Sequence, residues 1–190
     1  MRRIIFCLLA GVMLGACQST DKDNNGDIQR VAMVSVLKEN YLMSASRNVV
    51  GWKPGGLHVE PGDKFNVNDM TLAIESAIKE ILLEKGYRFD DTANNPHLQV
   101  SYLAALEEEV SDEEIVRRFG IMPGFNRQSP DASRFQKGTI VIDIMDVEIG
   151  KSVWRGAVQG FAALEKSQDE RKKRVKSIFQ ELMLQFPGKV

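Results

Sequence analysis

The sequence contains few of the residues that commonly form disulfides, metal sites or nucleophiles. Its 190 residues include only two cysteines, Cys7 and Cys17, and both lie near the N-terminus. We expect Cys7 to leave with a signal peptide and Cys17 to be acylated. No thiol then remains for a disulfide, a metal site or nucleophilic catalysis. The mature domain must therefore be stabilised by its hydrophobic core.

Histidines are equally scarce, and the familiar catalytic motifs are missing. His58 and His97 belong to no H-E-x-x-H pattern, and the chain has no G-x-S-x-G motif. Gly150-Lys151-Ser152 resembles the end of a P-loop, but Met145 occupies the position of the first glycine and a strand is expected after the serine. We therefore predict a protein that is not an enzyme, with no catalytic residue, cofactor, cofactor-binding site or metal.

Neither sign of charge dominates the chain. It carries 25 basic and 26 acidic side chains, for a net charge of −1. This near-neutral balance argues against a dedicated nucleic-acid-binding protein. The hydrophobic content of 43% and charged content of 27% are typical of a globular domain.

The chain also lacks a hydrophobic run long enough to span a bilayer. The uncharged segment from Ile4 to Ala16 has 13 residues, fewer than the roughly 20 that a transmembrane helix needs. Arg2-Arg3 precedes it, and Leu14-Gly15-Ala16 leads directly into Cys17. This pattern resembles the bacterial lipobox and predicts a lipoprotein signal peptide over residues 1–16. The alternative is an ordinary secretory signal cut at an A-x-A-like site.

Lipidation of Cys17, with palmitate among the attached chains, would anchor the protein stably to a membrane. Gln18 stands where an aspartate commonly signals inner-membrane retention, so we expect the outer membrane with the domain facing the periplasm. The inner membrane and the cell surface stay open as alternatives. Residues 17–27 form the predicted lipidated tether, which would reach about 17 Å as a flexible chain.

The tether also contains the first half of an EF-hand-like calcium loop. Asp21, Asp23, Asn25 and Gly26 occupy its positions 1, 3, 5 and 6. Position 12, where a glutamate is required, is Ala32, and a strand is expected there. We therefore predict a plain tether and no metal site.

Hydrophobic periodicity predicts a single α+β domain over residues 28–190. Two long helices are expected at 66–85 and from Ser167 onward, and a short helix at 111–119. Strands are expected at 28–37, 48–53, 98–106, 138–148 and 152–164. We predict an antiparallel sheet of about five strands with two long helices packed on one face, the other face being solvated or binding something.

Several of these segments resemble a known family. Residues 138–143 read G-T-I-V-I-D, residues 154–156 read W-R-G, and a closing helix ends at Phe186-Pro187. With Gly86-Tyr87 and the strand at 98–102, they resemble small Gram-negative lipoproteins defined only as a domain of unknown function.

The resemblance covers roughly residues 28–187. It implies the fold and an envelope location, but no activity. The chain departs from the family in retaining only Trp52-Lys53-Pro54 of its tryptophan-proline step, and in a loop at 120–134 that has fewer glycines and aromatics.

Two regions are candidates for an interaction surface. Ile121, Met122 and Phe125 lie in the loop after the short helix, where they either pin the loop to the core or form a contact surface. Trp154 and Arg155 point to opposite faces of a strand, so we expect a buried tryptophan and an outward arginine, with a binding role as the alternative.

A basic cluster at 171–174 and Lys176 is expected to be a solvated helix face, with an anionic partner as the alternative. The sequence therefore predicts a non-catalytic binding or envelope-assembly module, with an envelope protein as a possible partner and no nucleic acid. The alternatives are an envelope hydrolase, built around Asp143 or His97, and an accessory lipoprotein subunit of an envelope transporter.

Overall fold

The computed structural model describes residues 31–37, 47–60, 66–92, 94–121, 131–164 and 167–188. Cys17, the tether, Met122 and Phe125 lie outside these ranges. The elements follow one another in the order β1 (Val31–Leu37), β2 (Val49–Val59), α1 (Val67–Glu84), β3 (Arg88–Phe89), β4 (Leu98–Leu106), α2 (Asp112–Phe119), β5 (Phe135–Asp146), β6 (Lys151–Ala163), α3 (Gln168–Leu182) and the 3-10 turn η1 (Met183–Gln185).

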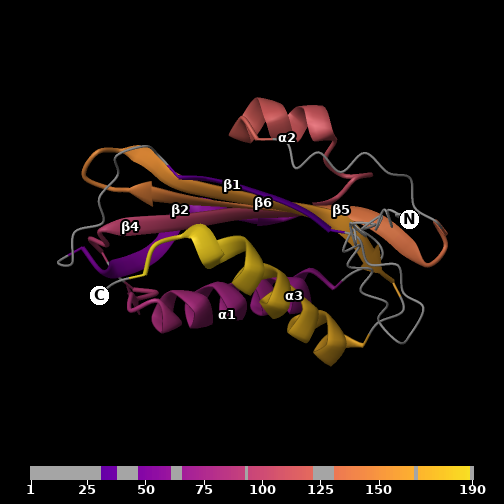
Figure 1. Cartoon of the computed structure of the whole chain (residues 1–190), viewed down its shortest axis with the longest axis horizontal. Coiled ribbons are helices and arrows are strands. Elements are labelled where there is room, and N and C mark those ends of the chain that lie inside the picture. Colours follow the sequence, from indigo (N-terminus) through magenta and orange to yellow (C-terminus); the bar gives the residue numbers. More distant parts are fainter. Residues whose placement is uncertain are drawn as a thin grey trace, which may run out of the picture.

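The strands form one sheet in the order β1-β6-β5-β4-β2-β3, with α1 and α3 on one face and α2 on the other (Figure 1). The α+β class and the two long helices on one face are confirmed. The sheet is mixed, because β2 runs parallel to β3 and β4 whereas the other pairs are antiparallel. Parallel neighbours need a crossover, and α1 provides it between β2 and β3.

β2 is longer than the sequence predicts. The expected end at Lys53 is wrong, because the strand continues through Pro54-Gly55-Gly56 to Val59. Its register with β4 shifts between Trp52 and Leu57, and Gly55 adopts a positive φ of 67°. The Pro-Gly-Gly step thus forms an irregularity within the strand, and pairing with β4 resumes after it.

Side-chain caps form at the helix starts that the sequence predicts. The Asn66 side chain accepts a hydrogen bond from the backbone N–H of Asp69 at the start of α1. Ser111 caps α2 in the same way, and Gly120 ends it with φ 65°. Ser167 and Glu170 form a capping box at the start of α3. No helix in the described ranges combines the length and the apolar content that a bilayer crossing requires.

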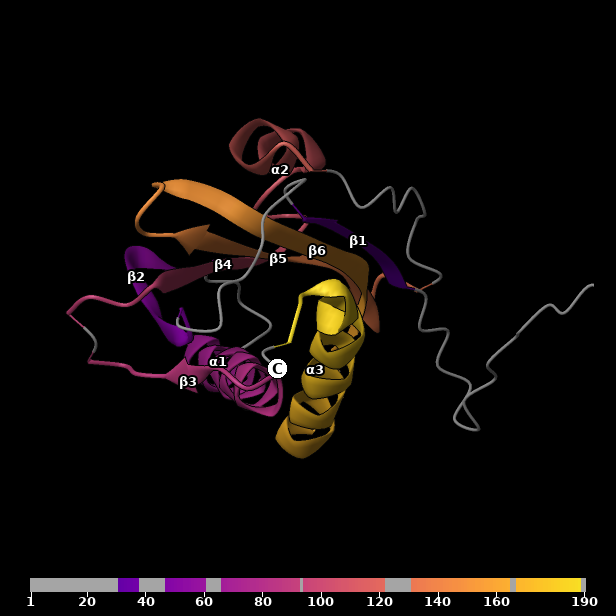
Figure 2. The same ribbon diagram turned by 60° about the vertical axis from the view of Figure 1, so that its left-hand side comes forward.

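The main core lies between the sheet and the helices α1 and α3, which pack against each other (Figure 2). Trp154 is 1% exposed, and its ring meets Phe186 edge-on at a centroid distance of 5.5 Å. The same ring lies over Gly156, where an added Cβ would sit 2.5 Å from Cη2 of Trp154. Within the W-R-G segment, the ring of Trp154 therefore packs on Gly156, which leaves room for it because it has no side chain.

A second, smaller cluster covers part of the opposite face. Ile115 of α2 and Ile121 pack there against Leu103, Val141 and Ala157 of the sheet. This face is therefore partly covered by the chain itself, where the sequence led us to expect either solvent or a ligand.

Candidate functional site

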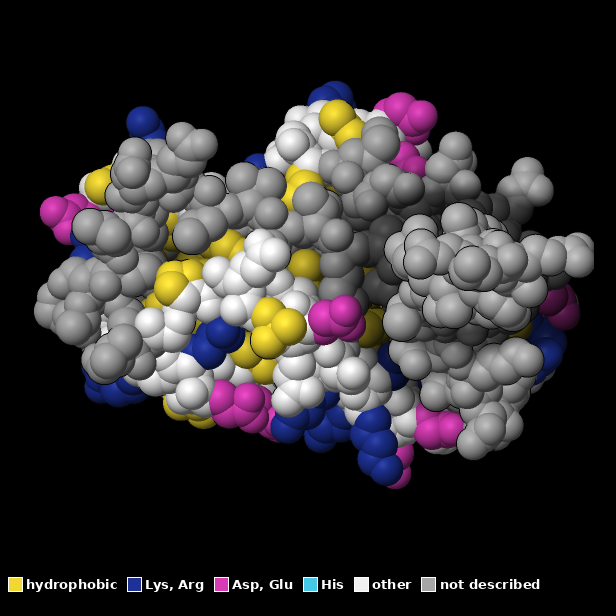
Figure 3. All heavy atoms as spheres, viewed as in Figure 1, with side chains coloured by type: hydrophobic (Ala, Val, Ile, Leu, Met, Phe, Trp, Pro, Cys, Tyr) yellow, Lys and Arg dark blue, Asp and Glu magenta, His cyan; other side chains and the backbone are white. Residues whose placement is uncertain are grey.

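A cleft of about 500 Å³ lies between the sheet and α3. It is lined by the end of β2 and parts of β4, β5 and β6 on one side, and by α3 with the first turn of α1 on the other. Figure 3 shows hydrophobic side chains reaching the surface beside lysine and arginine side chains on the face where α3 lies over the sheet. A cleft of this size falls within the range of small-ligand sites.

The floor of the cleft is open because the sheet carries small residues there. Alternate residues of a strand share one face, so Gly138 and Ile140 of β5 lie on the same side as Val158, Gly160 and Ala162 of β6. The two glycines and the alanine leave space that larger side chains would fill. Ile140 and Val158 make the remaining floor apolar.

The opposite wall continues the apolar stripe of α3. Val175 and Ile178 face the cleft, and Arg171 and Arg174 each lie four residues before one of them. Residues four apart share a helix face, so the basic residues extend the apolar wall to the mouth of the cleft. The Arg171 Nη2 donates to the backbone oxygen of Leu164 at 2.6 Å, which ties this end of α3 to the end of β6.

A buried polar cluster lies on the other face of the sheet, under α2. Lys137 is 7% exposed, and its Nζ is 3.1 Å from Glu107 Oε1 and 2.7 Å from Asp112 Oδ2. The Gln159 side-chain amide donates to Thr139 Oγ1 at 2.9 Å and also to Asp112. Burial acts to lower the pKa of Lys137, but the hydrogen bonds and charges of Asp112 and Glu107 raise it above its ordinary value. These paired groups hold the start of α2 on the sheet.

Arg155 holds the other end of α2. Its Nε donates to Asp143 Oδ1 at 2.7 Å, and its Nη1 donates to the backbone oxygen of Phe119. Ser152 Oγ donates to the same carboxylate oxygen at 2.6 Å. Arg155 thus lies on the outer face, as predicted, where it is held by Asp143 and Phe119. Asp143 serves as the acceptor that positions it.

The candidate interaction residues separate into three groups. Trp154 is buried, as expected, and Ile121 is buried as it would be if it pinned the loop to the core, so neither contributes to the exposed surface. Arg155 keeps partial exposure beside α2. Met122, Phe125 and the lipidation residue Cys17 lie outside the described residues, so their predicted roles stay predictions.

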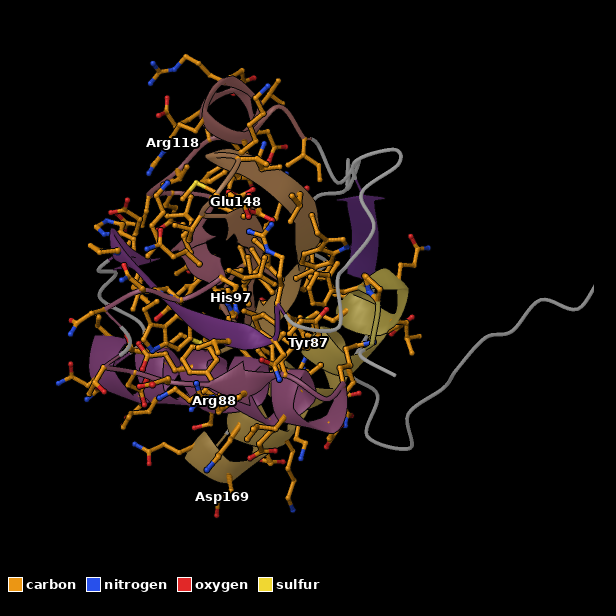
Figure 4. The ribbon with its side chains drawn as sticks, turned by 90° about the vertical axis from the view of Figure 1, so that its left-hand side faces the viewer. Tyr87, Arg88, His97, Arg118, Glu148 and Asp169 are labelled. Atoms are coloured by element: carbon orange, nitrogen blue, oxygen red, sulfur yellow. The ribbon has the colours of Figure 1, made fainter. Side chains whose placement is uncertain are left out.

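The two histidines serve local contacts. His58 Nε2 is 2.9 Å from Glu60 Oε1. The Nδ1 of His97, labelled in Figure 4, accepts a hydrogen bond from the backbone N–H of Val49 at 3.2 Å. Within the described ranges, no three His, Cys, Asp or Glu residues are arranged to hold a metal ion.

The sequence reasoning missed the cleft and expected its basic residues to be a solvated face. Lys172 and Lys173 are exposed as expected, but Arg171 and Arg174 are half-buried at the mouth of the cleft. The sequence did contain one signal for their position: Arg171 and Arg174 each lie four residues before an apolar residue of the same helix face, Val175 or Ile178. The small residues opposite gave no signal, because strand pairing alone brings them together.

The sequence matches the family described as "Domain of unknown function (DUF4136)" over residues 49–188. No curated protein matches the chain.

Three solved structures show more distant similarity. A PelC dodecamer from Paraburkholderia phytofirmans shares 11% identity, with 81% of this chain and 95% of that chain covered and a TM-score of 0.49. A PDZ domain protein from Parabacteroides distasonis shares 14% identity, with 84% and 36% covered and a TM-score of 0.44. A candidate lipoprotein from Caulobacter crescentus shares 11%, with 74% and 88% covered and a TM-score of 0.35.

Proposed function

Because the chain belongs to the DUF4136 family, whose function is unknown, we propose from its own structure that it is a lipid-anchored, non-catalytic binding module of the cell envelope. Its ligand has an apolar part that occupies the cleft beneath α3. The cleft is the observation that carries this proposal.

The composition of the cleft supports binding over catalysis. Its floor and walls are apolar side chains and small residues, and its charged residues stand at the mouth. An active site would need polar groups converging on one reacting atom. The two residues around which an envelope hydrolase could be built are already engaged: Asp143 with Arg155 and Ser152, and His97 with the Val49 backbone.

The location rests on the sequence pattern at Cys17. Acylation there would anchor the domain, and the glutamine that follows favours the periplasmic face of the outer membrane. An envelope partner protein is compatible with this arrangement.

Replacing Cys17 by alanine is expected to shift the protein from the membrane fraction to an unprocessed or soluble form. The reason is that no acyl chain can then be attached. Fractionation of intact cells, with mass spectrometry of the purified product, measures both outcomes. If the variant still fractionates with membranes at its mature mass, lipid anchoring through Cys17 is wrong.

Filling the cleft with Ile178→Trp is expected to abolish most binding of the neutral apolar dye N-phenyl-1-naphthylamine. Ile178 lines the cleft, so the larger ring occupies the ligand space. We would titrate the dye into the full Cys17→Ala chain, which carries no attached lipid, and follow its fluorescence.

The matched control is Leu184→Trp, because Leu184 is 72% exposed and does not line the cleft. Its dye binding should equal that of the parent chain. Thermal unfolding of both variants shows whether Ile178→Trp still folds. Equal binding by the two folded variants would refute a ligand site in the cleft.

A further inference from the structure

We infer that the ligand of the cleft is a single-chain anionic lipid, with its acyl chain inside and its carboxylate or phosphate group at the basic mouth. This inference rests on the proposed function and names the chemistry of the ligand.

The charges at the mouth favour an anion. Arg171, Lys173 and Arg174 line it together with the two acids Glu60 and Glu170. Both acids are engaged locally, since Glu60 lies 2.9 Å from His58 Nε2 and Glu170 accepts the Ser167 hydroxyl and backbone hydrogen bonds of the capping box. Among the described residues, Lys173 has no ion-pair partner, so its charge is available to a ligand.

The apolar interior suits an acyl chain. Aliphatic side chains, such as Ile140 and Val158 in the floor and Ile178 in the wall, line the interior together with small residues and offer few groups for a polar ligand to contact. A volume of about 500 Å³ lies in the lower half of the range for small-molecule sites, which favours one chain over the two of a phospholipid.

The chain enters the fold beside this cleft. Val31, the first residue of β1, pairs with Gly160, which lines the cleft. The 13 residues between Cys17 and Val31 can span no more than about 50 Å in any conformation. An anchored domain therefore stays close to a membrane that supplies acyl chains.

The test is displacement of N-phenyl-1-naphthylamine from the full Cys17→Ala chain by three ligands with the same twelve-carbon chain. They are dodecanoate, dodecyl phosphate and the neutral monododecanoylglycerol, each below its micelle concentration. We expect at least one anion to bind about tenfold more tightly than the neutral lipid at low salt. The difference should shrink as salt screens the basic mouth. The two anions show whether the favoured headgroup is carboxylate or phosphate.

Lengthening the chain of the favoured anion should raise its affinity about fourfold per added methylene until the cleft is filled. Lys173→Glu should reduce anion affinity about tenfold and leave the neutral lipid unchanged. Lys172→Glu is the matched control, because Lys172 neighbours it on α3 but does not line the cleft.

Each negative result has a distinct meaning. If the dye binds but all three headgroups compete equally, or Lys173→Glu has no more effect than Lys172→Glu, the anionic headgroup is wrong and the apolar site stands. If the dye binds and no acyl chain displaces it, the acyl ligand is wrong. If the dye does not bind to the parent chain, the proposed function itself fails.

Discussion

Replacing Trp154 by alanine is expected to lower the free energy of unfolding by about 3–5 kcal/mol. Trp154 is almost fully buried, and it belongs to the core that joins the sheet to α1 and α3. Its removal leaves a cavity beside Phe186 and Gly156 that a packed interior closes only in part. Because domains of this size are typically stable by about 5–15 kcal/mol, much of the fold's margin would be lost.

Urea unfolding followed by far-ultraviolet circular dichroism measures this loss without relying on tryptophan fluorescence. Leu184→Ala is the control, because Leu184 is largely exposed and its truncation should change stability by less than about 0.5 kcal/mol. A Trp154→Ala variant within 1 kcal/mol of the parent would contradict the packing described for this ring.

Replacing Gly156 by alanine should cost about 1–3 kcal/mol, although the change adds a single methyl group. The new Cβ would lie 2.5 Å from Cη2 of Trp154 and 3.1 Å from Cδ1 of Leu182. Both neighbours belong to the packed core, so neither can move without opening contacts elsewhere. Gly138→Ala is the matched control, because the nearest atom to its Cβ would be 3.6 Å away, an ordinary contact.

A double-mutant cycle separates this clash from a general effect of alanine in the strand. With Trp154→Ala already present, Gly156→Ala should cost far less than in the parent chain, since the ring that it strikes is gone. The two substitutions are therefore expected to be strongly non-additive. Additive losses would show that the ring of Trp154 does not limit the space at Gly156.

The W-R-G segment shows what the alternation of side chains along a strand can predict and what it cannot. Alternation alone places Trp154 toward the helices and Arg155 on the outer face, and the structure agrees. A glycine inside a strand, such as Gly156, is typical of a bulge or of a close approach by another group. That the approaching group is the ring of Trp154 itself is seen only in the folded core, where the ring also packs against Phe186.

The sequence was enough to predict those features whose interacting residues lie close together in the chain. Asn66, Ser111 and Ser167 each start a helix by binding backbone groups three residues away, and the sequence reveals such pairs directly. The α+β class and the hairpin of β5 and β6 follow from the same short-range periodicity. The lipobox at Cys17 is equally local, and it remains a prediction about the anchor.

Only the tertiary structure revealed the features whose interacting residues lie far apart in the sequence. The parallel pairing of β2 with β4, the ion pairs of Lys137 under α2 and the cleft beneath α3 all join segments that no short window contains. The cleft exists because Gly138 and Gly160 are paired across two strands while α3 places Ile178 and Arg174 on the opposite wall. Spacing along one element predicts which residues share a face, but only the assembled fold determines what that face meets.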